Sequence, residues 1–318
     1  MLYNIKKSFA IHHIQQGSHT IYFEEYGDPE GIPVLFLHGG PGSGCSSSHK
    51  ALFNSKKFRV IFLDQRGSGK STPKGETTDN NSIFLIEDIE QVRKFLGIPN
   101  WLIVGGSWGS TLAIAYAEKN NDKVNGLILR SLFLATQEEL DWAFFKAPLM
   151  FRPNLLFDIN MALKCKKIRN PIYLLGKLLD SKDVKDRCIG AELWLEYESN
   201  LSTLENKENK IKKIMEDKIF TKTRINSLPN TPFMEWHYIK NNFFFEHNQL
   251  IKNKFYLKSI PIRLIQSDYD LLCPPYTSYS FVQGLNNTEI HKVGKAGHYL
   301  NDPGVQEKMK EVINEFIV

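Results

Sequence analysis

A serine flanked by glycines gives the clearest chemical pattern in the chain. Gly105, Ser107 and Gly109 form a G-x-S-x-G sequence between a buried apolar run at 102–104 and an Ala-rich helical stretch. At a tight strand-to-helix turn, glycines let the two elements approach closely, and the serine Oγ is exposed above a helix N-terminus that favours negative charge. The pattern predicts that Ser107 is a nucleophile. The alternative is a glycine-rich turn that is only structural or that binds phosphate.

A second glycine-rich segment, HGGPG at 38–42, directly follows the apolar run at 34–37. Backbone N–H groups that point into a site stabilise an oxyanion without any side chain, and glycine lets a substrate approach them closely. The N–H groups of Gly40 and Trp108 are the predicted pair. Alone, this segment also fits an ordinary turn after a strand, but together with a strained serine it matches what acyl transfer needs.

A catalytic serine needs a base, and the base needs a carboxylate that orients it. Downstream of Ser107, the segment SDYDLLCPP offers Asp268 and Asp270, and the segment GKAGHYLNDPG offers His298. The chain order of serine, aspartate and histidine is one in which catalytic triads occur. Asp270 is preferred because it lies further past the preceding strand, although spacing separates the two aspartates only weakly. His291 lies inside a strand pattern and is predicted to pack or to face solvent.

Alternating strands and helices are predicted to position these residues. Amphipathic stretches predict helices, such as FLIEDIEQVRKFLG, in which Leu85, Ile89, Val92 and Phe95 recur on one face, and a last helix at 305–316. Apolar and β-branched runs predict strands at 20–24, 34–37, 59–63, 102–104, 127–129, 261–266 and 289–293. Such alternation is typical of an α/β fold with a mostly parallel sheet.

The middle of the chain, 135–256, loses the buried-strand signal and gains aromatic residues, Lys, Asn and Glu at helical spacing. We predict an inserted helical cap domain there, and an α/β core formed by 1–134 and 257–318. A length of 318 residues is compatible with one or two packed units.

The composition excludes several classes of protein. Hydrophobic residues make up 42% and charged residues 24% of the chain, which argues against disorder and coiled coil. A formal net charge of +5 is small at this length and predicts no nucleic-acid partner. The longest uncharged run is broken by glycine and serine, so no membrane partner is expected. The four cysteines show no disulfide or zinc spacing and no export signal is visible, so the expected compartment is the cytoplasm. The oligomeric state is left open.

The segments HGGPGSG, DQRGSGKSTP and GGSWGSTLAIAYA together resemble the proline iminopeptidase family, serine peptidases of the α/β-hydrolase fold. The resemblance continues through IEDIEQVRKFLGIPNW, QSDYDLLCPP and GKAGHY, so it covers nearly the whole core and, more thinly, the helical insertion. It implies an enzyme that releases N-terminal proline from short peptides through an acyl-enzyme, with no metal or other cofactor. By this resemblance the triad is Ser107, Asp270 and His298, which settles the choice between the two aspartates.

The same resemblance implies four further site residues. Glu198 in LWLEYES and Glu235 in FMEWHYI match acidic cap residues that bind the free amino terminus of the substrate. Arg130 and Phe133 match positions at the substrate pocket. Two carboxylates facing a cationic amine form charge-assisted hydrogen bonds, whereas without the resemblance both glutamates would be interpreted as surface charges.

Two positions depart from the family pattern. Ala143 stands where the family usually has an aromatic residue, and Ile239 stands where it commonly has Phe. Loss of two aromatic faces predicts a wider pocket and a less strict preference for proline. Two alternatives therefore stay open: an esterase or lactonase that uses the same serine, and a hydrolase-fold protein that binds a small ligand without turnover.

Overall fold

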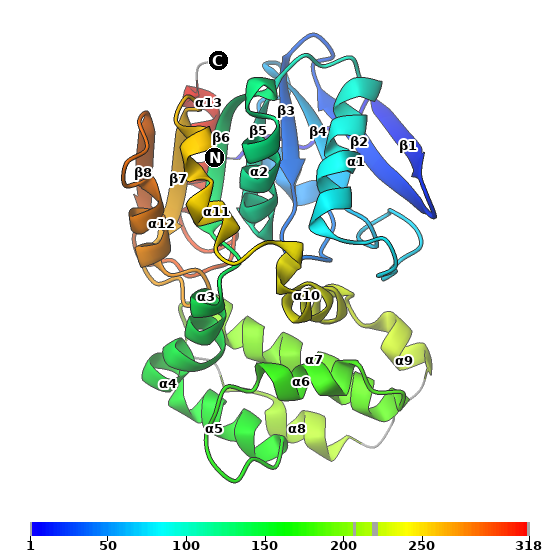
Figure 1. Ribbon diagram of the computed structural model, residues 1–318, viewed down its shortest axis with the longest axis vertical. Helices are drawn as coiled ribbons and strands as arrows, with labels where there is room; N and C mark the ends of the chain where they lie inside the picture. Colours follow the sequence, from blue (N-terminus) through cyan, green and yellow to red (C-terminus); the bar gives the residue numbers. More distant parts are fainter. Residues whose placement is uncertain (1, 206–207, 218–221, 317–318) are drawn as a thin grey trace.

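The larger part of the molecule is built on one eight-stranded sheet, and a group of helices lies at one end of this sheet (Figure 1). The computed structural model describes residues 2–205, 208–217 and 222–316. The strand order is β1-β2-β4-β3-β5-β6-β7-β8, with antiparallel pairing of β1 with β2 and of β2 with β4, and parallel pairing elsewhere. The strands are β1 (Ala10–Gln16), β2 (His19–Gly27), β3 (Ile32–Leu37), β4 (Phe58–Asp64), β5 (Trp101–Ser107), β6 (Val124–Leu132), β7 (Ile262–Ser267) and β8 (Thr288–Val293). The mostly parallel sheet predicted from the sequence is confirmed.

The strand β1 is the one strand of this sheet that the sequence did not predict. Along β1 the residues alternate between half-buried and exposed, and none is buried. It lies at the edge of the sheet and pairs only with β2. An edge strand without a buried side chain lacks the apolar run by which the other strands are recognised.

Side-chain alternation along the strands divides the core into two layers. In β3, Leu35 and Leu37 belong to the layer that contains α1 (Ser82–Phe95), α2 (Trp108–Lys119) and α12 (Pro275–Val282). Their neighbours Val34 and Phe36 belong to the opposite layer, which contains the 3-10 helix η1 (Ser47–Leu52) and α13 (Val305–Glu315). Each fully buried side chain of this size stabilises the fold by about 1.5–3 kcal/mol. The strands are therefore fixed from both faces, which makes their carboxyl ends a rigid platform.

The helix α1 shows where the predicted apolar face is right and where it is wrong. Leu85, Ile89 and Val92 are buried as the sequence indicated. Phe95, expected on the same face, is 57% exposed. It is the last residue of the helix, and its ring lies against aromatic rings of β1 and β2 at the sheet edge rather than in the core.

Between β6 and β7 the chain forms a layer of helices at the carboxyl ends of the parallel strands (Figure 1). The helices are α3 (Gln137–Asp141), the π-helical turn η3 (Trp142–Lys146), α4 (Ala147–Phe151), α5 (Pro153–Ala162), α6 (Ile172–Leu179), α7 (Val184–Ser202), α8 (Ile211–Glu216), α9 (Lys222–Ser227) and α10 (Thr231–Lys240). The chain then passes through η4 (Asn242–Phe244), and α11 (Gln249–Lys252) and η5 (Lys254–Leu257) pack on α2. Within the described ranges, no helix combines the length and apolar character needed to cross a membrane.

Candidate active site

Ser107 lies at a sharp turn between β5 and α2. Its backbone has φ 54° and ψ −125°, a region that non-glycine residues rarely adopt. The flanking glycines are required by space, because a Cβ on Gly105 would meet the backbone of Gly109, and a Cβ on Gly109 would meet the carbonyl of Leu37. The turn that the G-x-S-x-G sequence predicted is therefore formed by close contact of strand and helix. It presents the Ser107 side chain at the carboxyl edge of the sheet.

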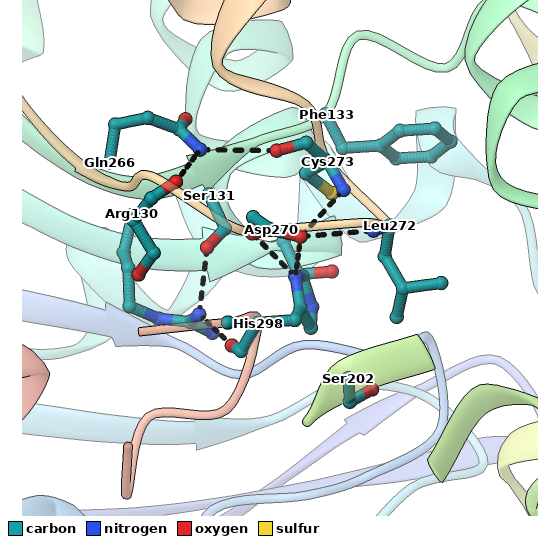
Figure 2. Close-up of polar contacts among 12 residues, drawn as sticks. Arg130, Ser131, Phe133, Ser202, Gln266, Asp270, Leu272, Cys273 and His298 are labelled. Carbon is teal, nitrogen blue, oxygen red and sulfur yellow. Dashed lines mark hydrogen bonds and ion pairs between the residues drawn. The ribbon is translucent and has the colours of Figure 1, made fainter. Parts of the chain in front are cut away.

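The imidazole of His298 is held by the carboxylate of Asp270 (Figure 2). His298 Nδ1 lies 2.9 Å from Asp270 Oδ2 and 3.0 Å from Oδ1. Oδ1 also accepts from the backbone N–H groups of Leu272 and Cys273, at 3.0 and 2.8 Å. Burial alone raises the pKa of Asp270, but the imidazole and these hydrogen bonds outweigh it and lower the pKa below its ordinary value. Asp270 is thus a buried anion, whereas Asp268 is exposed.

The backbone of His298 is fixed from two sides. Its carbonyl accepts a 2.6 Å hydrogen bond from the guanidinium of Arg130, which also donates to Ser131 Oγ at 2.9 Å (Figure 2). Its N–H donates to the carbonyl of Ser202, the last residue of α7, at 2.9 Å. The sequence placed Arg130 at the substrate pocket; in the structure its guanidinium holds the histidine loop instead.

This contact predicts a positioning role for Arg130. We expect Arg130→Met to lower kcat by about tenfold or more and to change KM less than about threefold, because His298 loses an anchor while the substrate cavity is unchanged. Arg130→Lys should restore part of kcat, since an ammonium still donates to the carbonyl. Steady-state kinetics, with thermal melting to verify folding, checks this. If Arg130→Met and Arg130→Lys lost kcat to the same extent, and both also had a lower melting temperature, the role of Arg130 would be purely structural.

Cys273 lies close to Ser107, Asp270 and His298, and the sequence had not marked it. Its thiol interacts with the Ser107 hydroxyl, and its sulfur lies within 4.8 Å of ligand atoms of Asp270 and His298. Burial raises the pKa of this thiol well above its ordinary value, so it is neutral. A neutral thiol beside a carboxylate already occupied by an imidazole suits a triad better than a metal centre.

A cavity of about 70 Å³ opens beside Ser107. Gly40 lies in its wall, with φ +107°. Trp108, the first residue of α2, has a backbone N–H without a partner inside the helix. The predicted oxyanion pair thus flanks the nucleophile. The indole of Trp108 is fixed by a 2.8 Å hydrogen bond from Nε1 to Gln65 Oε1, which ties the helix start to the end of β4.

Two glutamates from different helices meet at this cavity. Glu198 on α7 and Glu235 on α10 both line it with Ser107. Their carboxyl groups interact with each other, and Glu235 Oε2 accepts from Trp194 Nε1 at 2.6 Å. Burial raises the pKa of both groups, and the neighbouring Glu198 carboxylate raises the pKa of Glu235 further. The pair therefore retains a proton to higher pH than free carboxyl groups do.

A third buried carboxylate, that of Glu139, also lines this cavity, but its oxygens already accept hydrogen bonds from the protein. It accepts from the N–H groups of Leu134 and Thr136, both at 3.0 Å, and from the Thr136 hydroxyl at 2.8 Å. Burial raises its pKa to about 7. With these donors it caps the start of α3, so its function is structural.

The remaining wall of the cavity is apolar. Phe133 lies there as the sequence predicted, together with Phe144 and Phe243, and both departures from the family pattern, Ala143 and Ile239, line the same space. Phe243 had no signal in the sequence, because it reaches the cavity through an unusual backbone with φ 55°.

Comparison with known proteins decides the family. Residues 32–305 match the model of the alpha/beta hydrolase fold. The chain is 33% identical over 319 residues to a proline iminopeptidase of Neisseria meningitidis, covering 99% of both chains, and 33% identical to one of Arabidopsis thaliana, covering 93% of this chain and 78% of that protein. The chain belongs to the proline iminopeptidase family.

Solved structures agree on the fold of this family member. The proline iminopeptidase-related protein of Thermus thermophilus matches with a TM-score of 0.61 at 19% identity, covering 96% of each chain. A haloalkane dehalogenase of Bradyrhizobium elkanii matches with a TM-score of 0.63 at 16% identity, covering 96% of this chain and 95% of the other. The fold and family that the sequence predicted are confirmed.

Proposed function

We propose that this chain is a serine exopeptidase that releases N-terminal proline from short peptides. The observation that carries the proposal is the placement of Glu198 and Glu235 in the same cavity as Ser107. A nucleophile alone fits many hydrolases, but two carboxylates beside it select a substrate that carries a positive charge next to the scissile carbonyl. The free imino group of an N-terminal proline has that charge in that position.

In the proposed first step, the Ser107 Oγ attacks the carbonyl of the N-terminal residue. Because Nδ1 of His298 is held by Asp270, Nε2 is the nitrogen left to take the serine proton and later to give it to the leaving amine. The buried carboxylate of Asp270 stabilises the imidazolium that forms between the two transfers. Water then attacks the prolyl-enzyme ester, with His298 again as base, and proline leaves.

The tetrahedral oxyanion is proposed to form between the backbone N–H groups of Gly40 and Trp108. Preorganised donors of this kind contribute about 2.7–4 kcal/mol each to the barrier reduction. The loop that carries Gly40 is fixed by His38, whose ring nitrogens lie 3.2 Å from the N–H of Gly44 and 3.1 Å from the N–H of Gln65. All groups that this mechanism needs are supplied by protein side chains and backbone, so it involves no metal or other cofactor.

The glutamate pair is proposed to bind the imino group of the substrate. In the empty site the two carboxyl groups are close, and like charges at this distance disfavour full ionisation. A bound cation replaces the shared proton and forms charge-assisted hydrogen bonds to both. The substrate is thereby held by its free terminus, and a peptide with a blocked terminus would leave buried charge unpaired.

We also propose the remaining assignments as parts of this function. Segment 135–256 is interpreted as a cap domain, because α7 and α10 bring its glutamates over Ser107. The four cysteines are free thiols, which supports a reducing compartment such as the cytoplasm. The proposed partners are short peptides that begin with proline.

Three substrates test the proposal: a prolyl chromogenic amide, its N-acetylated form, and a simple acyl ester. We expect rapid release from the first, and kcat/KM lower by about a hundredfold or more for the acetylated form, because acetylation removes the charge that the glutamates bind. Ser107→Ala provides the background for each substrate. Faster turnover of the ester than of the prolyl amide would favour an esterase, and no turnover of any substrate would favour a binding protein.

A further inference from the structure

Phe243 forms part of the wall of the proposed substrate cavity. Its side chain is buried and lines the cavity that contains Ser107. Its ring stacks on Trp108, with centroids 5.9 Å apart and planes at 27°, and meets the ring of Phe133 edge-on at 5.3 Å. It therefore touches both the residue that follows the nucleophile and the predicted wall of the proline pocket.

The backbone that carries this ring is strained. Asn242, Phe243 and Phe244 have φ values of 50°, 55° and 57°, a left-handed run that is a genuine outlier for bulky residues. It is held by a 2.5 Å hydrogen bond from Ser82 Oγ to the carbonyl of Phe243 and by a 2.9 Å bond from the Phe244 N–H to the carbonyl of Asn241. Strained backbone persists only where the surroundings enforce it, and it is concentrated at ligand sites.

The position of this ring complements the two small side chains of the same cavity. Ala143 and Ile239 are aliphatic and present no aromatic surface, and the sequence predicted a wider pocket on that account. The cavity measures about 70 Å³, and Phe243 lines it together with these two side chains. We infer that Phe243 determines specificity, because its ring limits the substrate's first residue to the size of proline. This inference rests on the proposed function.

The experiment is a comparison of kcat/KM for prolyl, leucyl and phenylalanyl chromogenic amides in the wild type and in Phe243→Ala. We expect the ratio of leucyl or phenylalanyl to prolyl turnover to rise about tenfold or more in the variant, since a few methylene groups of pocket space change discrimination by at least this factor. Phe243→Leu, which keeps apolar bulk and tests the same point if Phe243→Ala does not fold, should raise the ratio less.

Phe244→Gly is the matched control. Phe244 shares the left-handed backbone, but its ring packs on His237 and Tyr238 and does not line the cavity. The ratio should stay within about twofold of the wild type in this variant. An unchanged ratio in both Phe243 variants, or an equal rise in Phe244→Gly, would overturn the inference. If the wild type cleaved esters but no prolyl amide, the proposed function would fail, and the ratio of bulky to small acyl esters would still test Phe243.

Discussion

Ser107→Ala is expected to lower kcat by about four to six decades while KM for the prolyl amide changes little. Removal of a triad nucleophile costs this much because the attacking oxygen is lost, while the oxyanion donors and substrate contacts remain. The cavity is expected to keep its shape, since the change removes one hydroxyl oxygen and leaves the other lining residues unchanged. Steady-state kinetics with a prolyl chromogenic amide, at enzyme concentrations high enough to detect residual turnover, measures the effect.

The control for this variant is a buried serine away from the cavity. Ser71 is 1% exposed, donates from Oγ to the carbonyl of Asp64 at 2.6 Å, and lies between β2 and β4. Ser71→Ala should lower the free energy of unfolding by about 1 kcal/mol and leave kcat unchanged. Retention of more than about 1% of wild-type kcat by Ser107→Ala would contradict the assignment of the nucleophile.

The sheet could be predicted because its strands are buried on both faces. Val34 and Phe36 on one side, and Leu35 and Leu37 on the other, leave a continuous apolar run in the sequence. The edge strand β1 has no such run, since one of its faces is exposed, and it was missed. A strand can thus be predicted from an apolar run only where its side chains are buried. At the edge of the sheet the side chains are partly exposed, and the run is absent.

Spacing alone predicted Ser107 as nucleophile and His298 as base, but it separated the two aspartates only weakly. Asp268 and Asp270 lie two residues apart in one loop after β7, and nothing local decides which of them faces the histidine. Tertiary structure decides it: Asp270 is 2% exposed and accepts three donors, whereas Asp268 is exposed. The direction of a loop side chain depends on packing between distant segments, which spacing does not encode.

Other residues near Ser107 and His298 were placed differently or missed for the same reason. The family resemblance placed Arg130 at the pocket, but its guanidinium donates to the carbonyl of His298, 168 positions away. Phe243 gave no signal, since its route into the cavity is a left-handed backbone that no local sequence preference predicts. Ser202 contributes only a backbone carbonyl, for which residue type carries no information.

The glutamate pair gives the second large expected effect. Glu235→Gln keeps the shape of the side chain and an acceptor for Trp194 Nε1, which lies 2.6 Å away, but it removes the charge. We expect kcat/KM for the prolyl amide to fall about 10- to 100-fold, corresponding to the loss of one charge-assisted hydrogen bond of about 1.5–3 kcal/mol. An acyl ester without an amine should change less than about threefold. Glu198→Gln should give the same result. Equal losses of kcat/KM for the amide and the ester would show that the two glutamates do not bind the substrate's amino group.

The pH dependence of KM separates this role from simple packing. Burial raises the pKa of both carboxyl groups above the ordinary value of 4.5, so the wild-type pair holds a proton that the ammonium must displace. KM should therefore fall as pH rises from the ordinary pKa toward the raised one. This fall in KM should end at about pH 8, where the substrate's own amino group loses its charge. In Glu235→Gln, KM should lose most of this pH dependence.

Stability is expected to fall as pH rises, whereas the affinity for the substrate increases. Between the ordinary carboxyl pKa of 4.5 and the raised one, the folded state binds more protons than the unfolded state, so unfolding becomes easier as pH rises. Glu235→Gln carries no such proton, and its melting temperature should therefore gain on the wild type as pH rises from about 5 to about 8. A constant difference in melting temperature would mean that the pair is not strained in the empty site.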